Sequence, residues 1–444
     1  MNVKTASLAA MAVGLLSVSS LHAEDKSWKS VSRLPAEARV WPSKPPKDCP
    51  FEQSTQFGGI AFTGRYVHYT KADGWYPSWA ADGNLYSSWA DGSIEKGVSC
   101  WSFRYENART GQAKVVGDDP FNLKVVNLGT SSVDARPFRG RYSCGSLVHN
   151  GVWYYGTYCL HDKDAAGKYM GPLTWDTMGP FVGWRISTDF GKTWDEGKHT
   201  PSKPLFPEPK KFGGSVKLGS PMFVDFGRNM EHSPDGKAYI VAQGAIEPDP
   251  KPRAGNCSWV SADQVFLARV TPSIKTINDE SQYEYFAGHD AKGNPIWTDD
   301  FEKIKPLIDW NNNCGFASIT YNAPLKKYFM AVTDGKDKNK SPFDSYILES
   351  DRLTGPWRLI TYMREFGQQA YFLQILPKFL SDDGRTGWML WCANFYGEKG
   401  KSFFKSDPPG SNYGFSLHEF KLITPEKNRT TPKPADPPTA SPSR

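Results

Sequence analysis

The chain has 444 residues, of which 14% are aromatic and 23% charged, and its formal net charge is +6. Acidic and basic residues are interspersed, so the sequence lacks the basic stripe that nucleic-acid binding needs. No segment approaches the roughly 18 consecutive apolar residues of a membrane-spanning helix. The seven cysteines include no C-x-x-C pair, and neither they nor the histidines have the spacing of transition-metal ligands.

The N-terminal segment has the pattern of a secretory signal. Lys4 precedes an apolar run over residues 9–18, and Leu21-His22-Ala23 precedes two acidic residues. We therefore expect residues 1–23 to be a signal peptide and the protein to be secreted or periplasmic, with an uncleaved anchor as the alternative. Residues 24–57 are rich in Pro and Lys and predict an irregular extension.

A hairpin pattern then recurs five times along the chain. Each copy has an aromatic or apolar run, a turn such as Asp82-Gly83 or Asn150-Gly151, and a second aromatic run. Asp-Gly and Asn-Gly between alternating hydrophobic residues are the strongest short hairpin signal. The copies cover residues 76–86, 145–154, 232–241, 318–328 and 378–388.

A second hairpin follows each of these copies, so each repeat predicts a four-stranded antiparallel sheet. Five such sheets predict an all-β fold, a five-bladed β-propeller over residues 58–423. A β-sandwich or scattered hairpins are the alternatives. The Pro-, Thr- and Ser-rich tail, residues 424–444, is expected to be disordered. The predicted inner strands lie near residues 75–81, 144–149, 221–228, 315–321 and 371–380.

Polar residues precede each predicted inner-strand turn by about nine or ten positions, a strand's length at a rise of ~3.3 Å per residue. In a propeller, such residues would converge at one end of the central channel. A ring of unrelated solvated loop ends would have the same pattern. The rim candidates are Asp73, Arg141, Asp225, Asn312 or Asn313, and Gln374 with nearby Gln369 and Tyr371.

Paired carboxylates suit the hydrolysis of a glycosidic bond, in which one carboxyl protonates the leaving oxygen and the other activates water or attacks the sugar. We predict Asp73 as the base, and Glu231 or Asp225 as the acid. Burial would raise the pKa of Glu231 as an acid requires. An exposed loop is the alternative for this polar stretch. Substrate contacts are expected from Trp75, Arg141, Asn229, His232, Asn313, Gln369 and Tyr371, although a lone histidine such as His232 can equally be structural.

Three arginines, Arg136, Arg139 and Arg141, alternate before the second predicted inner strand. Alternate residues of an extended chain point to one face, and guanidinium groups bind carboxylates bidentately. This pattern indicates an acidic glycan, or else ion pairs with neighbouring carboxylates.

The repeat region, residues 58–423, resembles the five-bladed β-propeller glycoside hydrolases related to arabinanases and β-xylosidases. The resemblance rests on Asp73 before Asp82-Gly83, on Asp225 before Asp235-Gly236, and on the turn Gly355-Pro356-Trp357. It implies that Asp73 is the base or nucleophile and that Asp225 orients the acid. The family's acid is a Glu at the start of an inner strand, and the near match, Glu231, is displaced by several residues.

Two further motifs resemble known propeller features and are interpreted as structural. Residues 187–194 resemble the Asp-box of sialidases, an outer hairpin turn away from the site. The turn at Gly355-Pro356-Trp357 is similar to an outer-strand signature in which the Trp packs between blades.

The predicted function is an exported glycoside hydrolase acting on a plant or algal polysaccharide. The alternatives are a sialidase-like enzyme or lyase that uses Tyr371 and the arginines on an acidic glycan, and a non-catalytic glycan-binding propeller. No cofactor is expected, and a structural Ca²⁺ held by carboxylates is left open. We expect a monomer in which some cysteines pair and at least one thiol stays free.

Overall fold

The computed structural model describes residues 29–33, 37–163, 168, 176–208, 216–247, 257–335, 341–393 and 407–425. The predicted signal peptide and nearly all of the predicted C-terminal tail lie outside these ranges. Within them, the regular elements are β-strands and short 3₁₀ helices. A search of the described residues finds no helix that is both long enough and apolar enough to span a membrane.

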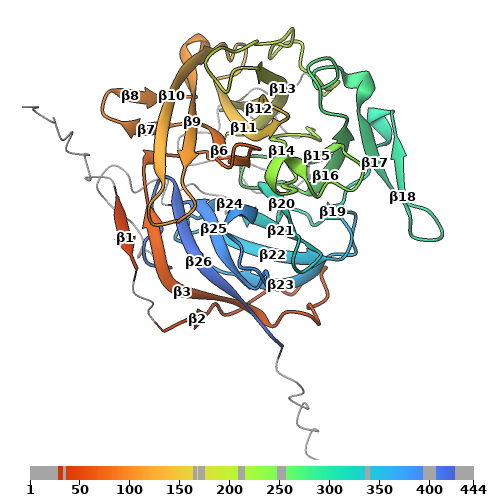
Figure 1. The fold of residues 1–444 in the computed structure, drawn as a ribbon. Helices are drawn as coiled ribbons and strands as arrows, with labels where there is room; N and C mark the ends of the chain where they lie inside the picture. The colour runs from red at the N-terminus through yellow and green to blue at the C-terminus, as the bar shows by residue number, and fades with distance from the viewer. Residues whose placement is uncertain are drawn as a thin grey trace, which may run out of the picture.

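Five antiparallel sheets, called sheets 1 to 5 here, follow one another around a common centre (Figure 1). Sheet 1 contains β5 (Ser78–Trp79), β6 (Leu85–Trp89), β9 (Ala108–Val116) and β10 (Lys124–Val133). Sheet 2 contains β11 (Gly140–His149), β12 (Val152–His161) and β13 (Thr177–Ser187). Sheet 3 contains β14 (Met222–Phe223), β15 (Ala238–Gly244), β16 (Gln264–Val270), β17 (Glu284–His289), β18 (Pro295–Thr298) and β19 (Ile308–Asp309).

Sheet 4 contains β20 (Ala317–Asn322), β21 (Lys327–Asp334), β22 (Asp344–Ser350) and β23 (Arg358–Met363). Sheet 5 contains β24 (Tyr371–Ile375), β25 (Thr386–Cys392), β26 (Ser416–Ile423) and β3 (Gly59–His68), with β1 (Ser30–Ser32) and β2 (Arg39–Val40) paired to β3. A small additional sheet joins β4 (Lys71–Ala72), β7 (Gly92–Glu95) and β8 (Val98–Cys100). The 3₁₀ helices are η2 (Tyr105–Asn107), η3 (Arg228–Met230), η4 (Glu280–Gln282), η5 (Phe301–Lys303) and η6 (Pro377–Phe379).

The first strand of each sheet in chain order lies innermost, if β3 is set aside as the strand that closes sheet 5. These inner strands are β5, β11, β14, β20 and β24, and each overlaps one of the five predicted segments, although β11 begins four residues before its segment and β20 ends one residue after. The turns are also where the sequence predicts them. Asn150 and Gly151, for example, join β11 to β12 with φ of 50° and 81°, the positive values that a tight hairpin turn needs.

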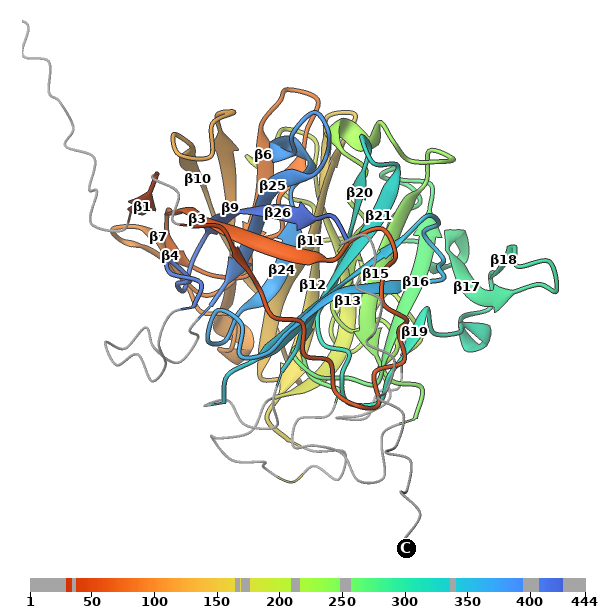
Figure 2. The same cartoon turned by 90° about the horizontal axis from the view of Figure 1, so that it is seen from below.

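The number of strands per sheet departs from the prediction of four. Sheet 2 has three strands within the described residues, because the chain after β13 forms a tight turn and pairs back only through the isolated bridge between Ile186 and Asp195. The hydroxyl of Ser187 accepts the amide of Gly191 in this turn. Sheet 3 instead has extra strands, and its β17–β18 hairpin projects from the body of the molecule (Figures 1 and 2).

The N-terminal extension runs along the outer strands of sheets 4 and 5. The amide of Lys44 donates to the carbonyl of Tyr362, and that of Ser54 donates to the carbonyl of Leu359. The indole of Trp41 packs edge-on against Phe366, at 5.1 Å between ring centroids. Part of the segment predicted to be irregular is therefore held by backbone pairing and by core contacts.

Aromatic pairs fill the junctions between neighbouring sheets, which explains much of the high aromatic content. Each junction has at least one pair of rings at contact distance, and together these side chains form the core. The pairs, with their centroid distances, are Tyr86–Trp153 (5.3 Å), Trp184–Phe223 (4.3 Å), Phe226–Tyr328 (6.4 Å), Phe316–Phe372 (4.4 Å) and Trp75–Phe415 (5.1 Å).

We expect Gly145→Ala to destabilise the protein by about 1–3 kcal/mol, as overpacking does. Gly145 lies at a register shift in β11, and a Cβ there would be 2.6 Å from the carbonyl oxygen of Pro221 in the next sheet. The colliding atom belongs to the backbone and cannot rotate away. Urea unfolding measures the effect, with the exposed Ser132→Ala on β10 as the control, and equal midpoints for both variants would contradict it.

Candidate functional site

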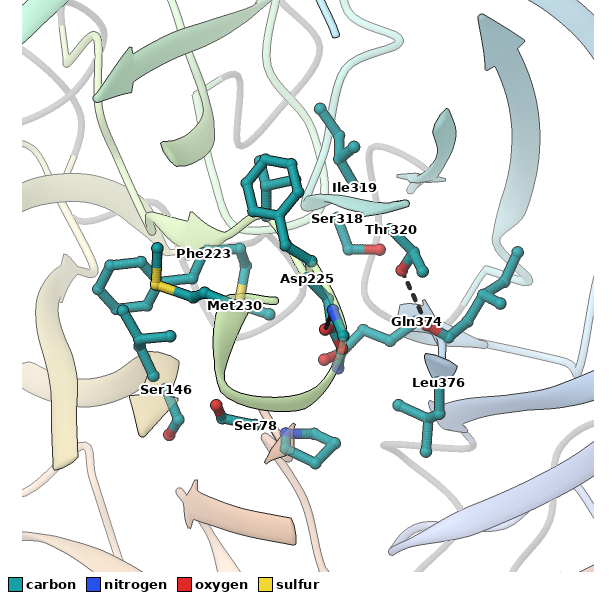
Figure 3. A pocket seen from close by; sticks show the side chains of 17 residues that line it. Ser78, Ser146, Phe223, Asp225, Met230, Ser318, Ile319, Thr320, Gln374 and Leu376 are labelled. Atoms are coloured by element: carbon teal, nitrogen blue, oxygen red, sulfur yellow. Dashed lines mark hydrogen bonds between the residues drawn. The ribbon is translucent and has the colours of Figure 1, made fainter. Parts of the chain in front are cut away.

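The five inner strands surround one small cavity on the central axis (Figure 3). Its volume is about 20 Å³, enough for about one water molecule. All five sheets contribute to its lining. The lining side chains that bear polar groups are Ser78, Ser146, Asp225, Ser318, Thr320 and Gln374.

Most of these polar side chains bond to the backbone of a neighbouring sheet. The Ser78 hydroxyl accepts the amide of Val148 at 2.9 Å, which joins sheets 1 and 2. The Thr320 hydroxyl donates to the carbonyl of Ile375 at 2.8 Å, which joins sheets 4 and 5. The Gln374 amide donates to the carbonyl of Trp75 at 2.7 Å, which joins sheets 5 and 1. Several side chains that line the cavity therefore form hydrogen bonds that connect neighbouring sheets.

Asp225 is the acidic residue of this cavity, and Figure 3 places it among the labelled side chains of four other strands. Its carboxylate accepts the amide of Gly227 at 2.9 Å. Among the described residues no cationic side chain bonds to it. Burial raises the pKa of Asp225 to about 7, which the Gly227 amide offsets only in part.

The segment from Asp225 to Glu231 lies at the turn end of the inner strands. The Arg228 guanidinium donates to the carbonyl of Ala81, directly before the Asp82-Gly83 turn. The Asn229 side chain exchanges hydrogen bonds with Asn150, at the turn of sheet 2. The spacing rule placed Asp225 at the opposite end. β14 pairs with β15 over only two residues, and the chain then leaves the sheet to form η3.

The environments of Glu231 and His232 also differ from the expectation of a buried acid. Their side chains are 51% and 40% exposed, and they approach each other at 3.7 Å. The His232 ring also lies 5.8 Å from that of Tyr321. The side chains therefore lie in a solvated pair rather than in a desolvated pocket.

Asp73 lies at the other end of the inner strands, five residues before the start of β5 at Ser78. Its side chain is 7% exposed. One carboxylate oxygen accepts the amide of Asp91 at 3.0 Å, and the other accepts the Tyr371 hydroxyl of sheet 5 at 2.8 Å. Burial and the nearby Asp73 charge raise the pKa of Tyr371 well above its ordinary value. Tyr371 is therefore a neutral phenol that donates to Asp73.

The charges of two further carboxylates, Asp91 and Asp176, act together with that of Asp73 on the phenol of Tyr142 on β11. Burial and the charges of Asp91, Asp176 and Asp73 raise the pKa of Tyr142 well above its ordinary value. Asp91 also accepts the amide of Ser102. Asp176 directly precedes β13, and burial raises its pKa to about 6 despite the Arg139 charge. Carboxylates of unlike environment thus influence the pKa of one phenol.

The other predicted substrate-binding residues have structural contacts. The Trp75 indole is fully buried and donates to the carbonyl of Ala72. The amide of Asn313 donates to the carbonyl of Asn311. Gln369 is fully buried and donates to the carbonyl of Ser341.

The three alternating arginines do not converge on one pocket. The exposed Arg136 pairs with Asp134 at 2.6 Å, and Arg139 pairs with Asp162 at 3.2 Å. Arg141 is buried and donates to the Thr157 hydroxyl at 2.9 Å. Arg136 and Arg139 therefore form the ion pairs with neighbouring carboxylates that were the alternative prediction. The three arginines do not form one pocket for the carboxylate of an acidic glycan.

No sequence pattern predicts Asp91, Asp176 or the buried Glu208 as functional residues. Both oxygens of Glu208 accept the amide of Lys217, and burial raises the pKa of Glu208 to about 7. None of these residues belongs to a repeat motif or precedes a turn at the counted spacing. Their signal is burial, which depends on segments distant in the sequence.

No group of three or more possible metal ligands occurs among the residues that the structure describes. All seven cysteines are free thiols, and burial raises the pKa of several, including Cys144 and Cys392. The pairing that export would allow is thus not present in this structure.

A scan against protein-family models and a search of curated proteins find no match. Solved structures that are similar include a GH43_1 enzyme from Xanthomonas citri, at 13% identity over 80% of this chain and 88% of that one, with a TM-score of 0.42. A xylan β-1,4-xylosidase from Bacillus halodurans is 11% identical over 74% of this chain and 51% of its own, with a TM-score of 0.40. An α-L-arabinofuranosidase from Podospora anserina is 10% identical over 88% and 98%, with a TM-score of 0.39. These are glycosidases of the kind that the sequence resembles.

We expect Asp225→Asn to raise the melting temperature at pH 8 and to have a smaller effect at pH 4. The pKa of Asp225 is about 7 in the folded protein and near the ordinary 3.8 when unfolded. The unfolded chain therefore releases this proton first, and the stability of the wild type falls as the pH rises from about 4 to 7. The amide removes that loss.

Thermal melts of both proteins between pH 4 and 8 measure this difference. Asp299→Asn, at an exposed position, is the matched control and should follow the wild type. A difference between Asp225→Asn and the wild type that is constant with pH would contradict the raised pKa.

Proposed function

We propose that the protein is a glycoside hydrolase whose catalytic carboxylates are Asp73 and Asp176. The observations that carry the proposal are that both carboxylate charges act on the phenol of Tyr142, that hydrogen bonds fix Asp73, and that the pKa of Asp176 is raised. The proposal includes an arrangement of the five sheets as blades of a five-bladed propeller. The contacts of β11 with β5 and β14, of β14 with β20, and of β20 with β24 support it.

Asp73 has the role of the base in this proposal. The Asp91 amide and the Tyr371 hydroxyl each donate to a different oxygen of its carboxylate. The two donors hold the group as an acceptor and fix its orientation. Asp73 can then take a proton from the water that attacks the anomeric carbon, while Tyr371 stabilises the carboxylate's position.

Asp176 has the role of the acid. With a pKa of about 6 it keeps its proton in mildly acidic solution, so it can protonate the leaving glycosidic oxygen. Unlike Glu231, it is partly buried; unlike Asp225, it lies at the same end of the inner strands as Asp73. For these two reasons the proposal assigns the acid to Asp176 instead of either residue predicted from the sequence.

The sialidase-like alternative has less support. That chemistry needs several arginines around one substrate carboxylate, together with a nucleophilic tyrosine. Here Arg136 and Arg139 each pair with a different aspartate. One feature does fit the sialidase-like alternative, because the Tyr371 hydroxyl bonds to the Asp73 carboxylate.

The substrate class and the site of action belong to the same proposal. We infer a polysaccharide or oligosaccharide of plant or algal origin. The signal-like residues 1–23 support an exported enzyme that meets such polymers outside the cytoplasm. A panel of glycans and 4-nitrophenyl glycosides, assayed for reducing ends and nitrophenol, identifies the substrate.

We expect Asp73→Asn to lower kcat by about 100- to 10,000-fold on that substrate, because the lost group accepts a proton in the transition state. Asn keeps the size of the side chain and one of its acceptor oxygens, so the variant should fold. Asp225→Asn should stay near the wild-type rate. A wild-type rate for Asp73→Asn, or an equal loss in Asp225→Asn, would contradict the assignment.

We expect Asp176→Asn to lose activity on the natural glycoside but to keep most of it on a 2,4-dinitrophenyl glycoside, whose leaving group needs no proton. In the wild type, kcat/KM on the natural glycoside should fall as the pH rises through about 6, where Asp176 loses its proton. The variant should lack this limb of the profile. Equal losses on both substrates would assign Asp176 a structural role.

A further inference from the structure

A loop between β8 and β9 presents aromatic side chains to solvent. Trp101 and Tyr105 are 45% and 47% exposed. The rings of Trp101 and Phe103 meet edge to face, with 5.9 Å between their centroids. Most aromatic side chains of the described residues are buried between sheets, so three of them close together on one surface loop need another explanation.

The loop is fixed in place by backbone hydrogen bonds. Arg141 donates its amide to the carbonyl of Ser102, and Arg109 donates its amide to the carbonyl of Trp101. Gly140 permits the close approach, because a Cβ there would lie 3.1 Å from the Cα of Phe103. The exposed rings are therefore held in one arrangement before any ligand binds, which lowers the entropy cost of binding.

The loop is also connected directly to the proposed catalytic end. Ser102, which lies between Trp101 and Phe103 in the sequence, donates its amide to the Asp91 carboxylate at 2.5 Å. Asp91 in turn donates its own amide to Asp73 at 3.0 Å. Two consecutive hydrogen bonds thus join the aromatic surface to the predicted base.

One cation of this surface has no acidic partner. The Arg104 guanidinium lies over the Trp101 ring at 4.7 Å, and no carboxylate of the described residues pairs with it. Arg139, which lies over Phe103 at 5.7 Å, is already paired with Asp162. Arg104 is therefore available to bind an anionic group beside an exposed indole.

We propose that Trp101, Phe103 and Arg104 form a subsite for a sugar unit that carries a carboxylate, in the same glycan chain that is cut at Asp73. The apolar C–H face of the sugar would stack on the indole. The guanidinium would bind the carboxylate bidentately. The inference rests on the proposed function for the identity of the chain, but the binding itself requires no catalysis.

The test measures binding with the catalytically impaired full chain, Asp73→Asn. Its mobility in native gels is followed in the presence of polygalacturonate, glucuronoxylan and alginate, and of the carboxyl-reduced form of each. We expect at least one acidic polymer to retard the protein, and its reduced form to retard it less. Adding Trp101→Ala should weaken the retardation by at least about tenfold.

Arg104→Gln should reduce the preference for the acidic polymer while leaving binding of the reduced polymer unchanged. It should also remove much of the salt dependence of binding. Phe190→Ala is the matched control, since Phe190 is 37% exposed but packs on Tyr86, far along the chain from this loop. Melting temperatures confirm that each variant folds.

The outcomes separate this subsite from the proposed function. No retardation by any acidic polymer, or equal retardation of the Trp101 and Phe190 variants, would overturn the subsite even if the wild type hydrolyses a glycan. Retardation that depends on Trp101 and Arg104, with no hydrolysis of any glycan by the wild type, would support the subsite and overturn the hydrolase.

Discussion

Hydrogen bonds between the inner strands of neighbouring sheets hold the rest of the structure in position. An inner strand has a partner on one side only, and its free edge would leave buried backbone groups unpaired. Hydroxyl and amide side chains meet this need, as Ser78 does for Val148 and Gln374 does for Trp75. Since these hydrogen bonds fix the position of each inner strand along the central axis relative to the next, they also determine which side chains of neighbouring sheets are in contact. The bond from Tyr371 on sheet 5 to Asp73, which precedes the first strand of sheet 1, depends on that alignment.

Burial of acidic groups is the second constraint, and it divides the inner strands into two ends. Asp225 occupies the turn end and Asp176 the opposite end, and burial raises the pKa of both. A carboxyl in an apolar setting without a cation destabilises the fold once it ionises. Among the described residues, the Asp225 carboxylate accepts only the Gly227 amide, and it lines a cavity of about 20 Å³. The charges of Asp176 and Asp73 both act on the phenol of Tyr142, so a proton held by Asp176 belongs to the end that contains the proposed base.

The sequence predicts the parts of the fold that depend on local chemistry. Asn150-Gly151 forms a tight turn because both residues accept positive φ, and the apolar runs around such turns become the inner strands. The end of the inner strands at which Asp225 lies could not be predicted in this way. The spacing rule assumes that the strand continues to the turn, whereas the chain leaves sheet 3 after Val224, pairs with Thr320 of sheet 4 at Asp225 and then folds into η3.

The candidate site was predictable only in part for a related reason. Asp73 precedes a strong turn signal and was found, whereas Asp176 follows a stretch with no motif and owes its raised pKa to burial. Trp75 shows the opposite error. An aromatic residue beside a predicted base suggests a sugar platform, but its ring packs on Trp89 and Phe415 in the core. Sequence spacing predicts which residues are neighbours along a strand. It does not predict which face of the strand is buried in the core.

The pairing of β3 with β26 has a consequence for how the chain assembles. Ile60 on β3 is paired with Leu422 on β26, so residues near the two ends of the described chain share one sheet. During synthesis, sheets 1 to 4 can form while β3 still waits for the strands that complete sheet 5. Sheet 5 is therefore completed last, and its completion joins segments of very large sequence separation, which is a slow kind of contact to form. Until then β3 is an exposed edge of apolar residues, the state of this protein most open to aggregation.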